Sequence, residues 1–426
     1  MKPHHALLRF PPAAVLYAVL LAGTFASTDG GAVPPANILY GQITSDRTLT
    51  ATSPGPIYEV VGDVVVTQGV TLTVEPGVEL RFAANRDTLQ GGGYPNLCEF
   101  RIYGALVANA SANDSIRFLS STGGAGAWAG IIVEVGGTAS LQHVAIRGGL
   151  SGIQSLGNSV LSHVAVSAFY DYGTGVILTG GSITWSRITD AYEGLWMRGL
   201  AAASNVELTN VHTGIVAGDC SIRECVITGR GAGTGAGLYL GSGSTTAHPD
   251  SLHPIPTTIS QFAWGVSLEG GVLRNAIVRD NGIGVKLQFG GRINYSTIVR
   301  NGTSGIEVAL CSNSQVARIE NSLVTNNSGP GIAVCLQSGS YADYLDSWLN
   351  GGGNYSFLTS NFTPGPNRLS EDPVYLNPAA NDFRLDSSSL FYTYSSSGGQ
   401  LGAYGPGEGL TSVRGKSWGA LKVRYR

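Results

Sequence analysis

The chain has 426 residues, of which 12% are charged, with 61 glycines and 18 prolines. Gly, Ser, Thr and Val interrupt every candidate helical window, which excludes a protein built from long helices. The net charge is −3 and the body carries no basic stripe, so nucleic acid is excluded as the expected partner.

The N-terminus has the pattern of an export signal. Lys2 and Arg9 precede an apolar run over residues 13–22, and Thr24 and Ala26 supply small residues where a signal peptidase cleaves. The run is shorter than the roughly 20 residues of a membrane-spanning helix, and no later run approaches that length. Residues 1–26 are therefore predicted to be a signal peptide, and the mature chain to be secreted, periplasmic or attached to the cell surface without a membrane span.

Residues 27–56 are rich in Gly, Pro and Thr, carry no period and are predicted to be a linker. Order is expected from Ile57, because the segments 64–66, 70–74 and 78–82 alternate apolar and polar residues. Gln68-Gly69 and Pro76-Gly77 stand between these segments and are typical of abrupt turns. The pattern predicts short strands that change direction sharply.

A glycine followed by apolar–x–apolar then recurs along the chain. It occurs at Gly175, Gly194, Gly214, Gly237, Gly265, Gly284, Gly305 and Gly331, at spacings of 19, 20, 23, 28, 19, 21 and 26 residues. Such a period is the mark of a solenoid, and alternation within each copy makes the repeat β. The leucine-rich and calcium-binding nonapeptide patterns are absent. We predict a parallel β-helix with about three strands per turn and an inserted, proline-bearing loop over residues 241–257.

Residues 57–82 resemble the opening rungs of bacterial right-handed parallel β-helix repeat proteins of the pectin-lyase-like superfamily. The resemblance continues to Asp372-Pro373, Asp382-Phe383 and residues 401–405, which are similar to the C-terminal cap of that family, although its Ser-Pro motif does not follow Ser389. The resemblance implies an all-β, single-stranded right-handed parallel β-helix over residues 57–360 and a cap region over residues 361–409.

Enzymes of this fold include pectate lyases and polygalacturonases, but the sequence lacks their residue sets. The Asn-Thr-Asp, Asp-Asp and His-Gly set of polygalacturonases is missing, and Lys286 is an isolated lysine at an outward position. Arg279, Arg300 and Asp280 are explained equally well by a solvated face. We therefore expect a non-catalytic scaffold, with a polysaccharide lyase or a glycoside hydrolase acting on acidic polysaccharide as the alternative.

One cluster combines aromatic and acidic residues on two successive rungs. Aromatic rings stack on the C–H faces of sugars while carboxylates accept hydrogen bonds from sugar hydroxyls, so this pattern favours carbohydrate binding. The predicted ligand-binding residues are Tyr170, Asp171, Tyr172, Asp190, Tyr192, Glu193 and Trp196. The expected partner is a polysaccharide or a surface protein, the chain is expected to be a monomer, and no catalytic residue, metal or cofactor is predicted.

Two stacks of equivalent residues follow from aligning the rungs. His143 and His163 lie 20 residues apart and are expected to stack, which is a usual β-helix feature and only weakly favours a metal site. Asp280, Asn301 and Asn326 are expected to share a corner, where Asn bonds backbone groups of the next rung. Both stacks are interpreted as structural.

The five cysteines, at positions 98, 220, 225, 311 and 335, are predicted to be mainly buried free thiols. Cys220 and Cys225 are close enough in sequence to pair, whereas the repeat alignment places Cys335 opposite Ala309 rather than Cys311.

The last residues, 410–426, form a basic tail. Five Lys or Arg residues alternate with apolar and aromatic residues after the period has ended. Binding to an anionic surface, a sorting signal and a disordered end remain three open interpretations.

Overall fold

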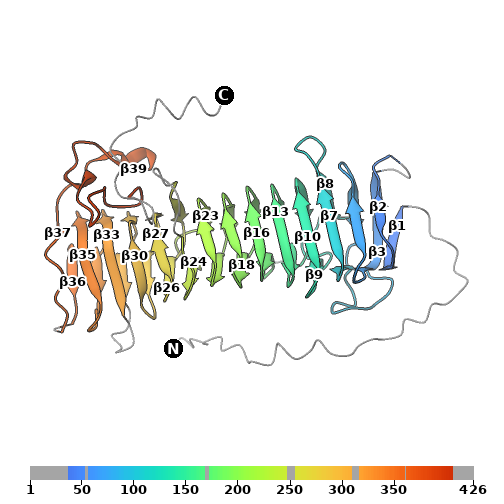
Figure 1. Cartoon of the computed structure of the whole chain (residues 1–426), viewed down its shortest axis with the longest axis horizontal. Coiled ribbons are helices and arrows are strands. Elements are labelled where there is room, and N and C mark those ends of the chain that lie inside the picture. The colour runs from blue at the N-terminus through green and yellow to red at the C-terminus, as the bar shows by residue number, and fades with distance from the viewer. Residues whose placement is uncertain are drawn as a thin grey trace, which may run out of the picture. The chain divides into compact units, whose positions relative to one another are not determined.

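The structure is a computed structural model that describes residues 37–52, 56–167, 172–246, 255–308, 316–359 and 361–405. The predicted signal peptide, the basic tail, Tyr170, Asp171 and Cys311 lie outside these residues. From Asn37 onward the chain forms one unit. It is a coil in which each turn passes through three parallel sheets, here called sheets 1, 2 and 3 in chain order (Figure 1).

Sheet 1 begins with the second halves of β1 (Ile38–Ile43) and β3 (Ile57–Val66). It continues through β6 (Glu99–Ile102), β9 (Gly130–Val133), β12 (Ile153–Ser155), β15 (Thr174–Leu178), β18 (Glu193–Arg198), β21 (Thr213–Gly218), β24 (Ala236–Gly241), β26 (Trp264–Glu269), β29 (Ile283–Leu287), β32 (Ser304–Val308), β34 (Ile332–Val334) and β36 (Tyr355–Phe357).

Sheet 2 contains β2 (Arg47–Leu49), β4 (Thr71–Val74), β7 (Ala105–Asn109), β10 (Thr138–Gln142), β13 (Asn158–Ser162), β16 (Gly181–Thr184), β19 (Ala202–Ser204), β22 (Ser221–Arg223), β27 (Val272–Arg274), β30 (Gly291–Asn294) and the first halves of β33 (Ala317–Thr325) and β35 (Tyr341–Trp348).

Sheet 3 contains the first halves of β1 and β3 and the second halves of β33 and β35. Between them lie β5 (Glu79–Phe82), β8 (Ile116–Ser120), β11 (Val144–Arg147), β14 (Ala165–Ser167), β17 (Arg187–Thr189), β20 (Glu207–Val211), β23 (Val226–Gly229), β25 (Thr257–Ser260), β28 (Ala276–Arg279) and β31 (Thr297–Val299), and β37 (Arg368–Leu369) is last.

The coil has about 13 turns, and its strands pair in parallel with the equivalent strands of the turns before and after. The connection that leads from one strand to the next parallel strand of the same sheet is right-handed in nearly all proteins. The predicted right-handed parallel β-helix, and the resemblance of the motifs to β-helix repeat proteins, are therefore confirmed at the level of architecture. The described residues contain no helix that is long and apolar enough to cross a membrane.

Alternate residues of each short strand fill the interior. Leu195, Ile215, Leu238 and Val266 occupy equivalent positions in four successive strands of sheet 1, and all four are fully buried. Near the start of the coil the filling is aromatic, where the Phe82 and Trp128 rings stack with centroids 3.8 Å apart. The core is therefore formed by every second residue of each strand, as the period-two alternation of the sequence predicts.

The recurring glycine lies where the next turn leaves no space for a side chain. A Cβ atom on Gly284 would lie 2.4 Å from the carbonyl oxygen of Gly305, and one on Gly265 would lie 2.6 Å from that of Gly284. The same clash is repeated along the whole column of motif glycines from Gly175 to Gly331. These glycines are required because any side chain would separate the rungs.

A buried asparagine ladder runs beside this column, one residue away from the predicted position. The Nδ2 atom of Asn301 donates to Oδ1 of Asn327 at 2.9 Å, and Asn281 and Asn350 extend the ladder on either side. Asn301 is the only one of the three predicted residues that belongs to it. Asp280 and Asn326 instead occupy the preceding corner position, which has a positive φ of 55–56°. A short polar side chain suits that left-handed conformation.

The C-terminal segment that follows β37 lies against the outer face of sheet 3. It contains β38 (Tyr375–Asn377), η2 (Pro378–Ala380), β39 (Asp382–Leu385) and η3 (Leu390–Tyr392), which Figure 1 shows folded back beside the last turns. Phe383 and Ala403 pack on Ile277 and Val299, while Phe391 and Leu401 pack on Leu323. The segment predicted as a cap therefore covers the side of the coil.

The C-terminal segment also contacts polar residues on and beside sheet 3. Arg300 forms an ion pair with Asp280 at 3.0 Å and donates to the Pro378 carbonyl oxygen at 2.8 Å. Thr325 is fully buried, with its hydroxyl 3.1 Å from that of Tyr375. A solvated face accounts for Arg300 and Asp280 only in part, because both stay partly exposed while the C-terminal segment contacts Arg300.

Both ends of the coil lie outside the predicted range 57–360. β1 and β2 pair with β3 and β4, so the first turn lies inside the segment predicted as a linker. A single terminal turn contributes no period, and its strands were therefore not recognised. At the other end β37 pairs with β35 beyond residue 360.

The inserted loop is also shorter than predicted. Thr245 forms bridges to Ser221 and Val272 and so continues sheet 2, and the buried Thr246 hydroxyl donates to the Arg274 carbonyl oxygen at 2.6 Å. Residues 247–254 of the predicted loop lie outside the described part of the chain, and Ile255 and Pro256 belong to no strand.

The cysteines divide into two classes. Cys98, Cys220 and Cys225 are buried free thiols, as predicted, and the suggested pairing of Cys220 with Cys225 does not occur. Cys335 is disulfide-bonded, so the expectation of a free thiol is wrong there. Strand register does not determine how the chain turns between strands, and it is therefore a poor guide to cysteine pairing.

The core register leads to a first prediction. Ile306 is fully buried, whereas its neighbour Glu307 points outward and accepts a hydrogen bond from Ser304 at 2.9 Å. Ile306→Ala should lower the free energy of unfolding by about 2–5 kcal/mol, and Glu307→Ala by no more than about 1 kcal/mol. Equal losses in urea unfolding of the two variants would contradict the register.

The asparagine ladder leads to a second prediction. Asn301→Ala removes the acceptor of the Asn281 amide and leaves buried polar groups unpaired, at about 1–3 kcal/mol each. We expect a loss of at least about 2 kcal/mol in the free energy of unfolding. The exposed Asn326 is the matched control, since Asn326→Gly suits its positive φ and should change stability by less than about 0.5 kcal/mol. A larger loss in Asn326→Gly than in Asn301→Ala would contradict the ladder.

A third prediction concerns pH. Asp346 is fully buried beneath the C-terminal segment, and burial, together with Glu371 and Asp372, raises its pKa to about 8. Since the folded pKa exceeds the unfolded one, its stabilising effect is fully present below about pH 4 and is lost as the pH rises through about 8.

The melting temperature should therefore fall between about pH 4 and 8 and level off above that, with a slope of up to about 1.4 kcal/mol of stability per pH unit from this group. Asp346→Asn keeps the acceptor for the Glu371 amide, which now donates at 3.1 Å, and should flatten the profile. An unchanged profile in Asp346→Asn would show that other groups cause the pH dependence.

Candidate functional site

The structure places the described members of the predicted cluster on sheet 1 and on the corner that precedes it. Tyr172, Asp190 and Tyr192 lie at the corner between sheets 3 and 1, while Glu193 and Trp196 belong to β18. Glu193 accepts a hydrogen bond from the Thr174 hydroxyl at 3.1 Å. Asp190 is exposed and accepts one from the Asn210 amide at 2.5 Å.

An aromatic stack follows this corner over three turns. The Tyr172 and Tyr192 rings have centroids 5.4 Å apart, and the Tyr192 ring lies 4.4 Å from the imidazole of His212 at an interplanar angle of 10°. Burial and the nearby Arg230 cation lower the pKa of His212 below its ordinary value, so the imidazole is neutral at pH 7. His212 was not predicted, although it occupies the position of Tyr192 one turn later.

The outer face of sheet 1 extends the cluster beyond the predicted residues. Trp196 and Tyr239 occupy the same outward row, two strands apart, and Trp264 lies in the neighbouring row that also contains Glu193. We call the outward side chains of Glu193, Trp196, Arg198, Tyr239, Trp264, Glu269 and Lys286 the aromatic face. Its later members were missed because the inserted loop interrupts the even spacing before Trp264, although the aligned glycine motifs place them in the same rows.

A third outward row contains a gap. Arg198 and Glu269 occupy this row three strands apart, and Gly218 and Gly241 hold the two positions between them. With strands about 4.8 Å apart, the gap leaves roughly 14 Å of the face without side chains in that row. The gap lies beside Tyr239 and is bordered by a cation at one end and a carboxylate at the other.

The pKa values of Tyr239 and Glu269 are both raised above their ordinary values. Burial, followed by the charges of Glu269 and Glu193, raises the pKa of the Tyr239 hydroxyl, and burial raises the pKa of the Glu269 carboxyl. Both shifts favour the protonated forms, so the Tyr239 hydroxyl is a hydrogen-bond donor near neutral pH. The face thus combines a donor with carboxylate acceptors.

Cations hold the two indole rings of the face. The Arg198 guanidinium lies 4.1 Å from the centroid of the Trp196 ring, and the Lys286 ammonium lies 4.0 Å from that of the Trp264 ring. Such contacts are favourable and fix the orientation of each ring. Lys286, which the sequence showed as an isolated lysine, is therefore part of the aromatic face.

The histidine stack predicted from the alignment is present elsewhere on the coil. The His143 and His163 rings stack with centroids 4.5 Å apart. Within the described ranges no group of three or more His, Cys, Asp or Glu side chains is placed to hold a metal ion. The stack has the geometry of the lateral rows that a β-helix forms from equivalent residues.

Comparisons with known proteins add little to this geometry. No family model and no curated protein matches the chain. Among solved structures, the chain is similar to pectate lyase Pel9A, with 15% identity over 80% of this chain and 88% of that chain at a TM-score of 0.44. It is also similar to the periplasmic alginate epimerase AlgG, with 13% identity over 75% and 79% of the two chains and a TM-score of 0.44.

A third similar structure is the A-module of mannuronan C-5 epimerase AlgE6 from Azotobacter vinelandii, with 12% identity over 78% of this chain and 89% of that chain at a TM-score of 0.23. These identities and TM-scores are too low to support an inference about what this chain binds. The function has to be argued from the aromatic face.

Proposed function

We propose that the chain is an exported β-helix scaffold that binds carbohydrate on the aromatic face of sheet 1 and performs no catalysis. The observation behind this proposal is the presence of Trp196, Tyr239 and Trp264 in two neighbouring outward rows of one face, with Glu193 and Glu269 on the same face. Large aromatic side chains on the outside of a sheet lose apolar contact with the core. Their presence in adjacent outward rows is explained when a ligand with apolar faces covers them.

A sugar chain has the required chemistry. Its rings present C–H faces that stack on aromatic rings, and its hydroxyls both donate to carboxylates and accept from the Tyr239 hydroxyl. The gap over Gly218 and Gly241 gives space for a ring beside Tyr239. A chain lying along the coil axis would meet Trp196 and Tyr239 roughly 10 Å apart, given two strand spacings of about 4.8 Å each.

A second candidate function rests on one observation. Burial raises the pKa of Glu269, as expected for a general acid, and Glu193 lies on the same face. Glycoside hydrolysis would use one protonated and one ionised carboxylate. The scaffold is preferred, because the register places Glu193 and Glu269 three strands and five residues apart, farther than the roughly 5–9.5 Å that separates the two carboxylates of a glycoside hydrolase.

The remaining parts of the proposal concern the setting of the protein. The N-terminal signal pattern supports export to the periplasm, the cell surface or the medium. A polysaccharide is the preferred partner over a surface protein, because the aromatic face combines aromatic rings with hydrogen-bonding groups. The chain is proposed to act as a monomer.

The fourth prediction tests the aromatic face. Neutral glycans selected on an array should bind the mature protein, and Trp196→Ala or Tyr239→Ala should weaken binding about 3- to 10-fold, since an aromatic contact contributes about 0.5–1.5 kcal/mol. Trp185→Ala is the matched control, because Trp185 is 61% exposed at the corner between sheets 2 and 3. Equal losses in Trp185→Ala and Trp196→Ala would remove the support for this face.

Reducing-end release from the bound glycans separates the two candidate functions. Binding without release supports the scaffold. Release by the purified protein that is abolished in Glu269→Gln, while glycan affinity is kept, would establish the hydrolase instead. Release that is unchanged in Glu269→Gln points to a contaminating activity and leaves the scaffold in place.

A further inference from the structure

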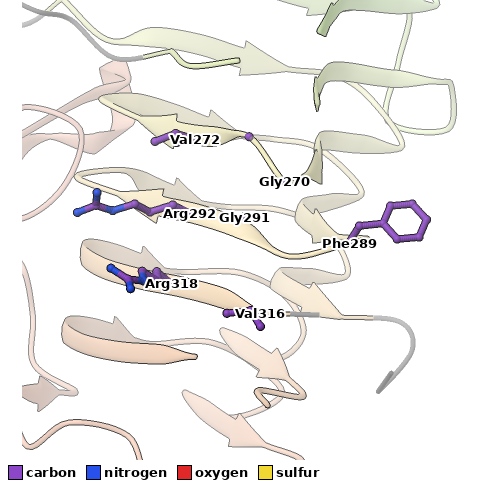
Figure 2. Close-up of a pocket in the computed structure, with 8 residues that line it drawn as sticks. Gly270, Val272, Phe289, Gly291, Arg292, Val316 and Arg318 are labelled. Atoms are coloured by element: carbon purple, nitrogen blue, oxygen red, sulfur yellow. The ribbon is translucent and has the colours of Figure 1, made fainter. Parts of the chain in front are cut away.

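A groove on sheet 2 lies outside the aromatic face and is not needed for the proposed function. It has a volume of about 340 Å³ and is lined by residues of three successive turns, among them Phe289, Arg292 and Arg318 (Figure 2). Glycines 270, 271 and 291 form its floor. Gly290 and Gly291 have φ values of 84° and 123°, and a Cβ on Gly290 would lie 2.2 Å from the Val316 carbonyl oxygen.

The groove exists because side chains are missing from its floor and large ones stand at its edges. Phe289 is 61% exposed and Val316 is 47% exposed, although both are apolar. Figure 2 shows Phe289 on one side of the groove and the two arginine side chains extending on the other side. The groove therefore has an apolar end and a cationic end.

The cationic end consists of two arginines in register. Arg292 of β30 is paired with Arg318 of β33, so their side chains leave neighbouring strands about 4.8 Å apart. Like charges placed directly opposite each other on adjacent strands are destabilising. Among the described residues only Arg292 of this pair has an acidic partner, Glu320, at 3.5 Å.

The pair is under-satisfied in the described part of the chain. The side chain of Arg318 is exposed and makes no hydrogen bond or ion pair with any described residue, and the buried Nε of Arg292 has no hydrogen-bond partner there. A buried donor without a partner is unfavourable and unusual in folded proteins. Two arginines with one carboxylate leave one positive charge and several unused donors at the same end of the groove.

These donors select the type of anion. A carboxylate has two oxygens, which a single guanidinium fork satisfies. A tetrahedral sulfate or phosphate ester presents three oxygens and can accept from both guanidinium groups at once. The flat glycine floor and the Phe289 ring at the other end suit a ring that carries the ester.

We propose that this groove binds a sulfate or phosphate ester carried on a sugar ring, with Arg292 and Arg318 holding the oxyanion and Phe289 contacting the ring. Glu320 orients Arg292 and is a positioning residue. The site lies on sheet 2 and on the corner between sheets 1 and 2, and its ligand is distinguished from that of the aromatic face by its charge.

The fifth prediction is tested by calorimetric titration of the mature protein with four probes: glucose 6-sulfate, glucose 6-phosphate, glucuronate and glucose. The two esters should bind, and raising the salt concentration should weaken them. Arg318→Gln and Arg292→Gln should each lower ester affinity about tenfold or more, the effect of losing a charge-assisted hydrogen bond. Phe289→Ala should lower it less.

Arg223→Gln is the matched control, since Arg223 ends β22 on the same sheet, several turns away. Unchanged affinity in this variant, with loss in Arg318→Gln, supports the site. Equal loss in both variants, no ester binding by the intact protein, or glucuronate binding as tight as that of the esters would each overturn it. The difference between sulfate and phosphate identifies which ester is preferred.

The melting temperature of each variant shows whether a loss of binding reflects misfolding. Arg318 is exposed and lacks a described partner, so Arg318→Gln should melt as the intact protein does. Trp196→Ala should keep ester binding, so failure of this proposal and failure of the proposed function are observed separately.

Discussion

The close approach of successive turns at the glycine column is the constraint on which the rest of the structure depends. A Cβ atom on Gly214 would lie 2.1 Å from the Gly237 carbonyl oxygen, so the strands of sheet 1 keep their spacing only when each turn has glycine there. That spacing holds the asparagine ladder in hydrogen-bonding distance, where Asn301 and Asn327 meet at 2.9 Å. The buried asparagine amides therefore keep their hydrogen bonds because the glycines beside them keep the turns close together.

Because the turns are in register, equivalent residues of successive turns form rows of side chains. The rows on the outer faces of the three sheets differ in composition. The rows of sheet 3 near the C-terminus are apolar at Ile277, Val299 and Leu323 and are covered by the C-terminal segment. Sheet 1 keeps aromatic and acidic rows on its outer face, and sheet 2 has the arginine pair. A solenoid buries its repeats only against their neighbours, so non-repeating outward residues are where ligand specificity arises.

The sequence predicted those features that repeat with the period. The strands, the motif glycines and the stack of His143 on His163 follow directly from alignment of the turns. The asparagine ladder was misplaced by one residue because the left-handed corner accepts Asp280, Arg300, Asn326 and Leu349 alike, and two of these resemble ladder residues. Conformation is conserved at that corner from turn to turn, whereas side-chain identity is not.

What the sequence could not predict comes from contacts between parts that do not repeat. The packing of Phe383 on Val299 joins residues more than eighty positions apart, and no period relates them. The aromatic face was recognised at Trp196 but not at Trp264, because residues inserted between β24 and β25 break the count along the chain. Sheet register restores it, since Ala236 pairs with Trp264 across that interruption.

The two candidate ligand surfaces meet near one corner and differ in charge for a local reason. β26 ends at Glu269, and Gly270 and Gly271 then carry the chain into sheet 2, where Arg292 lies in the next turn. The glycines that line the groove lie between the partly buried carboxyl of Glu269 and the arginine pair, and no ion pair joins them in the described structure. A ligand face with hydroxyls fits the acidic side of this corner, and an ester fits the basic side.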